Sequence, residues 1–412
     1  MKKILIPLLL LVFSVASAQD TLTIMYYNIL NYVPSNSANT KNLKNIVHYV
    51  NPDIFAINEI SDDTSSSHIL QYVMNTDSIS HYKRADFIDG PDTDDMLYYN
   101  SSKLSLISHD TIQTALRLIN EYLLFYNDAN YLSQHDTVYF DVYIAHLKAS
   151  SGSTNELDRL NEVLKFKNYL SNHTFRKNVF FGGDMNFYGS YEPALIELQT
   201  AGTYKMNDPL DSIGNWHDLA FYSHIHTQST RVRQFGGGAY GGLDDRFDFI
   251  FVSNDVISGS SQLKYIPGTY VAFGNDGHHF NDSLNALPLN PNIPDSITYS
   301  LYDQSDHLPV VMKTYLNFDA SIQESPAFSD ENIFTIFPNP ASDMIYINSL
   351  IKDSNCRLEI YTMDGQKKYS TEFSNGFINQ KNISLKNFKS GIYYIRILTQ
   401  GKAFSKRLVV IQ

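Results

Sequence analysis

The sequence predicts a layered α/β or α+β body followed by a small all-β module. Segments with strand-like patterns clearly outnumber segments with helical spacing in residues 19–316. From residue 333 onward, short strands broken by turns are the only pattern. The formal charge also changes sign: residues 19–333 hold 18 Lys and Arg against 38 Asp and Glu, giving −20, whereas residues 334–412 hold 11 against 5, giving +6. Two units with different roles are therefore expected.

The composition is that of a globular protein with two or three domains. Among 412 residues, 43% are hydrophobic and 18% are charged, which excludes a disordered chain. The single cysteine, Cys356, excludes an intramolecular disulfide framework and a cysteine-based zinc cluster. The acidic body argues against a protein that coats nucleic acid without regard to sequence, because such coating requires a basic surface.

The first 18 residues have the pattern of a secretory signal peptide. Lys2 and Lys3 precede an apolar run over residues 4–15, and the small residues Ala16-Ser17-Ala18 follow. The run is shorter than the about 20 residues that a membrane-spanning helix needs. We therefore expect residues 1–18 to be a signal peptide, and the protein to be secreted without a transmembrane segment.

Three helices are expected in the body. Leu43, Ile46, Val47 and Val50 lie at helical spacing, so residues 41–50 should be helical until Pro52 ends the pattern. A capping box, Ser153-x-x-Glu156, precedes apolar residues at helical spacing and predicts a helix over residues 155–170. A third helix is expected over residues 192–200, closed by a glycine at position 202.

The strands of the body are predicted from short apolar or alternating runs rich in β-branched and aromatic residues. They lie at residues 21–30, 54–57, 96–100, 103–108, 121–126, 138–145, 179–181, 247–252 and 308–316. Three loops stand out between them: an acidic loop over residues 86–95, a glycine-rich loop over 236–242, and a long loop over 267–294. Function is expected on loops that such a scaffold positions. A polar linker over residues 317–332 and a β module over residues 333–412 should follow this body, residues 19–316.

Acidic and amide side chains are placed where the predicted strands open into loops. Carboxylates at such positions are costly unless a cation or hydrogen bonds receive them. Because oxygen ligands dominate and histidines are few, the set suits Mg²⁺, Mn²⁺ or Ca²⁺ better than zinc. The residues are Asn28, Glu59, Asp184, Asn186, Asp248 and Asp306, with His307 next to the last.

The order of these residues resembles the endonuclease/exonuclease/phosphatase superfamily, the deoxyribonuclease-I-like fold. The resemblance covers about residues 22–315, and its most specific pieces are Gly-Asp-x-Asn at 183–186, Arg-x-Asp at 246–248 and Ser-Asp-His at 305–307. It implies a four-layer α/β sandwich. It also implies metal-assisted hydrolysis of a phosphoester.

The resemblance further implies a role for each residue. Asn28 and Glu59 would hold Mg²⁺, and Asp306 would be a further metal or acid/base group. Asp184 would orient or deprotonate the attacking water, and Asn186 would hold a substrate oxygen or the metal. His307, oriented by Asp248, would contact the scissile phosphate. His146 falls where the family places a residue near the leaving group.

Several positions leave alternatives open. Asp94 or Asp95 is the nearest candidate for a carboxylate that pairs with His146, although either is equally a plain loop residue. Phosphate-binding and surface roles are both open for four basic residues, Arg117, Lys148, Arg231 and Arg233. Two histidine pairs are more consistent with structural roles than with metal ligation: His224 with His226, and His278 with His279.

The tail resembles the C-terminal sorting domain of the bacterial type IX secretion system. The pieces that carry this resemblance are residues 337–341 (FPNPA), 361–365 (YTMDG), 390–394 (SGIYY) and 406–410 (KRLVV). It implies passage across an outer membrane by the type IX machinery, to the cell surface or the medium. A carbohydrate-binding β-sandwich is the alternative, but the tail lacks the aromatic cluster that such a domain needs.

The leading hypothesis is a secreted, monomeric, divalent-metal-dependent phosphoesterase, and first of all an endonuclease that hydrolyses phosphodiester bonds. A phospholipid or inositol-phosphate phosphoesterase of the same fold is the alternative. A catalytically inactive surface-binding module is the hypothesis from another class, but such a module should have lost part of the residue set.

Overall fold

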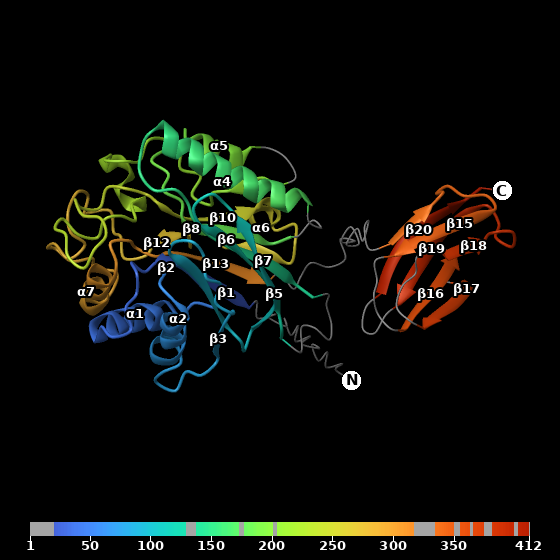
Figure 1. Cartoon of the computed structure of the whole chain (residues 1–412), viewed down its shortest axis with the longest axis horizontal. Coiled ribbons are helices and arrows are strands. Elements are labelled where there is room, and N and C mark those ends of the chain that lie inside the picture. The colour runs from blue at the N-terminus through green and yellow to red at the C-terminus, as the bar shows by residue number, and fades with distance from the viewer. Residues whose placement is uncertain are drawn as a thin grey trace, which may run out of the picture. The chain divides into compact units, whose positions relative to one another are not determined.

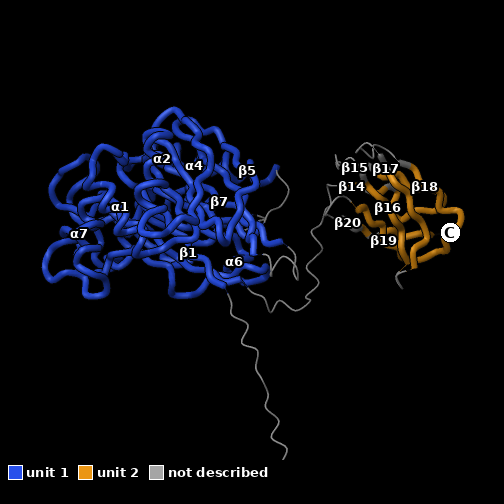
Figure 2. The backbone as a smooth tube through the Cα atoms, turned by 90° about the horizontal axis from the view of Figure 1, so that it is seen from below, with its two compact units in different colours: residues 1–319 blue, residues 320–412 orange. Residues whose placement is uncertain are grey.

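The computed structural model divides the chain into two compact units, residues 1–319 and 320–412 (Figure 2). The residues that the structure describes are 20–128, 137–172, 177–200, 204–316, 334–349, 355–362, 366–374, 381–398 and 403–411. The predicted signal peptide and linker lie outside the described residues. The domain bounds given above therefore stay a prediction.

The first unit contains two mixed β-sheets. Strand β1 pairs parallel with β2 and antiparallel with β13, and the first sheet has the order β11-β13-β1-β2-β4-β3, with β12 also paired to β13. Its strands are β1 (Thr21–Asn28), β2 (Ile54–Ile60), β3 (Tyr82–Arg84), β4 (Asp94–Asn100), β11 (Leu263–Tyr265), β12 (Val271–Ala272) and β13 (Val310–Leu316).

The second sheet has the order β5-β6-β7-β8-β10-β9. Strands β7 and β8 are parallel, and every other pair in this sheet is antiparallel. The strands are β5 (Leu104–Gln113), β6 (Leu118–Tyr126), β7 (Tyr139–His146), β8 (Val179–Asp184), β9 (Met206–Asn207) and β10 (Asp248–Ser253).

The two sheets pack face to face, and the alternation of side chains shows how. On β8, Phe180 joins a core shared with β1, β2 and β13, whereas Phe181 joins a second core that includes the helices α4 (Ser153–Asn172) and α5 (Pro193–Gln199). Ile250 and Phe249 on β10 divide between the two cores in the same way. Successive side chains of a strand point to opposite faces, so one face of the second sheet packs against the first sheet and the other face packs against the helices.

Helices cover the outer faces of both sheets. Figure 1 shows α4 and α5 on one side of the sheets, and α1 (Ser37–Val50) and α2 (Asp63–Ile69) on the other. Helix α1 lies along α7 (Asp295–Gln304) and buries Leu43, Ile46 and Val47 in the first core. Helix, sheet, sheet and helix make four layers, so the predicted α/β sandwich is confirmed.

Three α-helices among the described residues of this unit were not predicted: α2, α7 and the short α6 (Asn254–Ser258). Helix α2 reads Asp-Thr-Ser-Ser-Ser-His-Ile, which has no apolar periodicity, and it begins after an Asp62 cap that accepts from the backbone N–H of Ser65. Helix α7 lies just beyond the segment expected to be a loop and starts without a side-chain cap. Two short helical turns are also present, the π-helical turn η1 (Leu70–Met74) and the 3₁₀ turn η2 (Ala220–Ile225).

The second unit is a small β-sandwich in the residues described. One sheet has the order β14-β15-β18 and the other the order β17-β16-β19-β20. Ile345 and Ile347 from the first sheet share a core with Leu358, Ile360 and residues of β19 and β20 from the second. The strands are β14 (Phe334–Phe337), β15 (Met344–Ser349), β16 (Asn355–Thr362), β17 (Lys367–Ser374), β18 (Lys381–Ser384), β19 (Gly391–Leu398) and β20 (Ala403–Val410).

None of the helices in the described parts of either unit has the length and apolar character that crossing a membrane requires.

Candidate functional site

Strand register brings the predicted site residues to one edge of the sandwich. Within the second sheet, Asp184 lies opposite His146 on β7 and opposite Asp248 on β10. Within the first sheet, Asn28 lies opposite Asn58 on β2. Because the carboxyl ends of parallel strands meet at the same edge, these side chains reach the same space.

Two local backbone features orient the side chains of the site. Glu59 lies in a bulge between β2 and β4 and has a positive φ of 61°, which turns its carboxylate out of the strand alternation. Gly183 has a φ of 127°, and a Cβ there would lie 2.1 Å from the backbone oxygen of Ala145 and 2.7 Å from Asn58 Oδ1. Only glycine fits this approach, which lets Asn58 Oδ1 accept from the backbone N–H of Asp184 at 3.0 Å.

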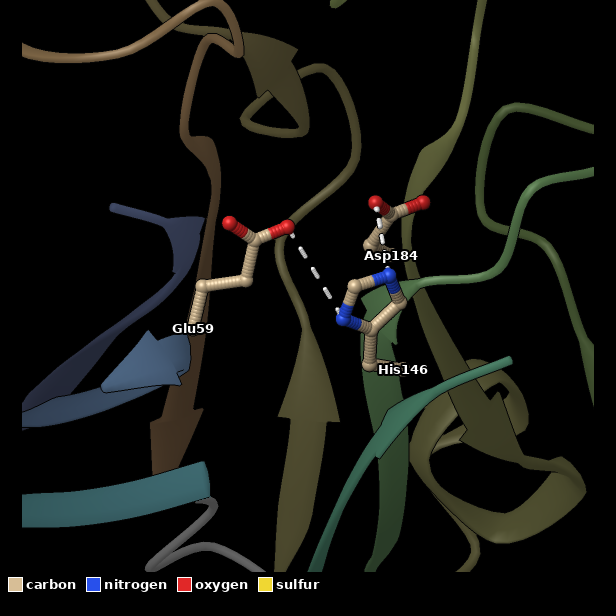
Figure 3. A group of neighbouring side chains, drawn as sticks. All are labelled: Glu59, His146 and Asp184. Carbon is tan, nitrogen blue, oxygen red and sulfur yellow. Dashed lines mark ion pairs between the residues drawn. The ribbon is translucent and has the colours of Figure 1, made fainter. Parts of the chain in front are cut away.

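Glu59, His146 and Asp184 form the centre of the site. Figure 3 shows the imidazole of His146 between the two carboxylates, with Nδ1 4.0 Å from Glu59 Oε1 and Nε2 3.5 Å from Asp184 Oδ2. One ligand atom from each residue lies within 4.8 Å of the others. This group brings together side chains from both sheets.

Two asparagines bind the carboxylates of this group. Asn28 Nδ2 donates to Glu59 Oε1 at 2.9 Å and to Asp184 Oδ2 at 3.2 Å, while its Oδ1 accepts from the backbone of Leu30. Asn31, which the sequence did not single out, donates to Glu59 Oε2 at 3.1 Å. Asn28 thus turns its nitrogen toward the acids, and a role as metal ligand would require its amide to turn over.

His307 and Asp248 form a buried pair beside this group. His307 Nδ1 lies 2.8 Å from Asp248 Oδ2, and His307 Nε2 lies 3.6 Å from Asp184 Oδ2. The hydroxyl of Ser305 donates to the backbone oxygen of Asn28 and accepts from the N–H of His307, so the histidine segment is tied to β1. The expected proximity of Asp248 to the His307 ring is therefore present.

The carboxylate of Asp306 is held from two sides. Its Oδ2 accepts from the backbone N–H of Ala239 at 2.6 Å and from Gln228 Nε2 at 3.1 Å. Gly238 of the glycine-rich loop, with a φ of 74°, lies so close that a Cβ would be 2.6 Å from Asp306 Cγ. The other carboxylate oxygen of Asp306, Oδ1, is buried without a hydrogen-bond partner among the described residues.

Burial and neighbouring charges shift the pKa values of the acids and of the two histidines in different directions. Burial raises the pKa of Asp184 to about 7, with Asp248 and Glu59 adding to the rise, and burial also raises the pKa of Glu59. Burial lowers the pKa of His146 well below its ordinary value, and Arg117 and His307 add to the decrease. Burial also opposes a charged His307, but the three nearby aspartates outweigh it and raise its pKa well above the ordinary value.

These residues fit a divalent cation. Several carboxylates share one buried space, and Asp248 Oδ1 and Asp306 Oδ1 lack a hydrogen-bond partner among the described residues. Crowded acids with raised pKa values are an arrangement that a cation would stabilise. Glu59 and Asp184 offer oxygen and His146 offers nitrogen, a set that could accommodate Mg²⁺ or Mn²⁺.

The other sequence-predicted residues divide into those near the site and those with structural roles. Asn186 is near it: its backbone N–H donates to Asp184 Oδ1 at 3.2 Å and its amide to the backbone oxygen of Leu147. The two candidate partners of His146 do not bond to it: Asp94 accepts from the backbone of Gly90, and Asp95 accepts from Asn58 at 2.6 Å.

Two of the four basic candidates, Arg231 and Arg117, are engaged within the protein. Arg231 is buried and donates to the backbone oxygens of Phe235 and Tyr302. Arg117 pairs with Asp92 at 2.8 Å and lies near the backbone of His146.

Two further candidates have structural roles. Arg246 of the Arg-x-Asp motif makes a buried two-pronged pair with Asp208 and lies over the rings of Phe249 and Trp216. His279 contacts Asp276 with one ring nitrogen and a backbone oxygen with the other, so both are occupied.

Comparison with known proteins identifies the tail. Residues 335–411 match the secretion system C-terminal sorting domain. This match confirms the predicted resemblance of the tail, and it supports secretion or display at the cell surface. No curated protein matches the chain.

Solved structures similar to this chain include members of the superfamily that the sequence resembles. D. rerio TDP2 with a single-strand DNA product is 13% identical, with a TM-score of 0.45, over 71% of this chain and 98% of that one. An endonuclease/exonuclease/phosphatase from Beutenbergia cavernae is 11% identical, with a TM-score of 0.45, over 94% and 100%. A mannosyl-6-phosphatase from Bacteroides thetaiotaomicron is 14% identical, with a TM-score of 0.42, over 71% and 99%. Values this low carry no argument about the activity of this chain.

The opposite pKa shifts of the two histidines are directly testable. In metal-free protein, NMR titration should find His307 still protonated at a pH where an exposed histidine has lost its proton, and His146 neutral at a pH where an exposed histidine is still protonated. Asp248→Asn removes the carboxylate that favours the charged imidazole, so the pKa of His307 should fall while His146 changes little. The His279 signal, which the His279→Gln variant identifies, is the control and should be unchanged in the Asp248→Asn protein. Equal titration of His146 and His307 would contradict the geometry described.

Proposed function

We propose that the protein is a secreted, divalent-metal-dependent phosphoesterase, and that its first candidate activity is endonucleolytic cleavage of phosphodiester bonds. The observation that supports this is the convergence of Glu59, His146 and Asp184 with the His307–Asp248 pair in one buried group. The group combines carboxylates that fit a cation, a carboxylate whose pKa burial raises, and two imidazoles. Metal-assisted hydrolysis of a phosphoester by water can use all three.

Glu59, together with Asp306 and a turned-over Asn28, would hold the metal ion, with Asp184 and His146 close enough to contribute. Mg²⁺ is the ion we propose, and Mn²⁺ or Ca²⁺ are alternatives. When bound, the ion would withdraw negative charge from the phosphoryl oxygens. Asn31 would keep Glu59 in place through its hydrogen bond to Oε2.

Asp184 is the group that we propose orients and deprotonates the attacking water. Burial raises its pKa in the free protein, so this carboxylate takes up a proton more readily than an exposed one does. The N–H of Asn186 fixes Oδ1 and leaves Oδ2 as the oxygen that faces the two imidazoles. Asn186 would in addition hold a substrate oxygen.

His307 would bind a phosphoryl oxygen through Nε2, because Nδ1 is engaged with Asp248. A charged imidazole at this position binds a phosphate anion better than a neutral one. His146, on the other side of Asp184, would lie beside the leaving group. Asp184 Oδ2 lies 3.5 Å from His146 Nε2 and 3.6 Å from His307 Nε2, so we propose that the reacting phosphorus binds close to both rings.

A substrate screen with a matched variant tests the proposal. The secreted protein with Mg²⁺ is incubated with plasmid DNA, RNA, bis(p-nitrophenyl) phosphate, sphingomyelin and an inositol phosphate. We expect cleavage of DNA or RNA, loss of activity with EDTA and recovery with Mg²⁺ or Mn²⁺. Glu59→Gln keeps the side-chain shape but removes a ligand charge, so turnover should fall about 100-fold or more. Turnover of no substrate would instead favour the surface-binding module, and turnover of sphingomyelin or the inositol phosphate alone would favour the alternative phosphoesterases.

A pair of glycine variants tests the role of Asp306. Gly238→Ala would place a Cβ 2.6 Å from Asp306 Cγ, whereas Gly237→Ala meets nothing within 4 Å. Both glycines have positive φ, so both variants carry backbone strain. Because displacing a reacting group by about 1 Å costs roughly 100-fold in rate, Gly238→Ala should lose far more turnover than Gly237→Ala. Equal losses, measured with equal melting temperatures, would exclude Asp306 from the reaction.

The sorting role of the tail is tested by deletion. Removal of residues 334–412 should leave the hydrolytic activity of lysates intact, because every residue proposed for the site lies before them, but should retain the protein in the periplasm. Cell fractionation and activity assays measure both effects. Normal release of the shortened protein to the surface or medium would contradict the sorting role.

A further inference from the structure

His217 and Tyr188 form an aromatic pair that the proposed reaction does not use. Their rings meet edge to face, with centroids 5.2 Å apart and planes inclined at 78°. The side chain of His217 is 45% exposed, and Tyr188 is half-buried against the ring of Phe247. Among the described residues, neither the Tyr188 hydroxyl nor His217 Nε2 has a hydrogen-bond partner, and the hydroxyl is not buried. Two polar atoms on adjacent rings are therefore open to a ligand.

Both rings are held in place by the surrounding chain. His217 Nδ1 lies 2.6 Å from Asp245 Oδ1, and the backbone N–H of His217 donates to the backbone oxygen of Tyr188 at 3.4 Å. The backbone N–H of Tyr188 donates to Glu192 Oε1 at 2.8 Å, and Glu192 pairs with the buried Arg159. A ligand would meet these rings without first having to order them, which lowers the cost of binding.

The aromatic pair lies next to the proposed site. The backbone of Asp245 pairs with that of Gln228, and Gln228 is bridged in turn to His307. Because adjacent strands lie about 4.8 Å apart, the backbone of Asp245 is roughly 10 Å from that of His307. Burial raises the pKa of the Tyr188 phenol, and Asp245 and Asp184 add to the rise, so this hydroxyl is within range of both carboxylates. A group attached to a phosphate at the site can therefore reach the pair.

The charges around the pair favour a neutral hydroxyl group over a second phosphate. Burial raises the pKa of Asp245 to about 6, and Asp244 and Asp218 add to the rise, so three carboxylates lie around His217. Within the described residues, no lysine or arginine forms an ion pair with these aspartates, and they would repel an anion. A hydroxyl both donates and accepts, so it satisfies the Tyr188 hydroxyl and, in either protonation state of the ring, His217 Nε2.

We propose that Tyr188 and His217 form a specificity subsite that binds a hydroxyl of the sugar esterified to the scissile phosphate. This rests on the proposed phosphoesterase function and names its substrate class: a phosphoester of a hydroxylated sugar, either a ribonucleotide or a free sugar phosphate. The rings supply apolar contact with the sugar, and the two polar atoms supply hydrogen bonds. Neither residue takes part in breaking the phosphoester bond.

Binding of two phosphonates tests the subsite without hydrolysis. The 5-phosphonate of ribose carries hydroxyls and butylphosphonate carries none, and the P–C bond of both resists hydrolysis. His217→Asn keeps a donor for Asp245 but removes Nε2, and Tyr188→Phe removes only the hydroxyl. In isothermal titrations of the Mg²⁺-loaded protein, each variant should bind the ribose compound about two- to tenfold more weakly, the equivalent of one hydrogen bond, and butylphosphonate within about twofold of the unaltered protein. His224→Asn and Tyr191→Phe, at exposed positions, are the matched controls and should bind both compounds normally.

Kinetics identify the source of the sugar. A higher KM of the two variants with the dinucleotide UpU indicates a ribonucleotide, and a higher KM with ribose 5-phosphate indicates a free sugar phosphate, whereas bis(p-nitrophenyl) phosphate, which has no hydroxyl, should be unaffected. Equal losses with the two phosphonates, no loss with either, or no binding of the ribose compound would overturn the subsite. If the phosphonate results hold but no phosphoester is hydrolysed, the proposed function fails and the subsite stands.

Discussion

The register between β7, β8 and β10 is the constraint on which the site depends. It places His146, Asp184 and Asp248 in one row at the edge of a sheet. Because side chains alternate along a strand, a slip of one residue would send Asp184 to the opposite face and place Gly183 or Met185 where it now lies. The alternating apolar residues of β8 and β10 oppose this slip, since Phe180 and Ile250 lie in one core and Phe181 and Phe249 in the other. Packing of the interior thus fixes the position of the charged edge.

The carboxylates at that edge are each stabilised by hydrogen bonds or by a neighbouring imidazole. The body is strongly acidic, and four carboxylates meet within it at the site. Glu59 accepts from two asparagines, Asp184 from a backbone N–H and an asparagine, and Asp306 from a glycine-rich loop and a glutamine, while Asp248 contacts an imidazole. Within the described residues none of the four pairs with an arginine; the buried arginine–carboxylate pairs at Arg159 and Arg246 lie elsewhere. The site keeps its negative character, as a place for a cation requires.

The sequence allowed the layered body, the β tail and the clustered strand-end residues to be predicted, because apolar alternation and strand order constrain where strand ends converge. The residues that reach the site from loops could not be predicted from the sequence. Gln228 and Asn31 reach the site through segments whose course depends on tertiary packing, and no periodic pattern marks them. Neither Asp94 nor Asp95, the two open candidates for a carboxylate that pairs with His146, bonds to it; Asp95 instead accepts from Asn58, whose Oδ1 accepts from the backbone N–H of Asp184. The roles assigned to individual residues stay predictions.

In the Arg-x-Asp motif, Arg246 has a structural role, whereas Asp248 belongs to the proposed site. Its side chain pairs with Asp208 and lies over an aromatic group that includes Trp216, whose indole N–H donates to the backbone oxygen of Phe187. Trp216 is the only tryptophan of the chain; it is fully buried, and its ring lies near that of Phe249, the neighbour of Asp248 on β10. The protein therefore contains a built-in optical reporter: its tryptophan fluorescence, unlike that of its tyrosines, follows the first unit alone, whatever happens to the tail.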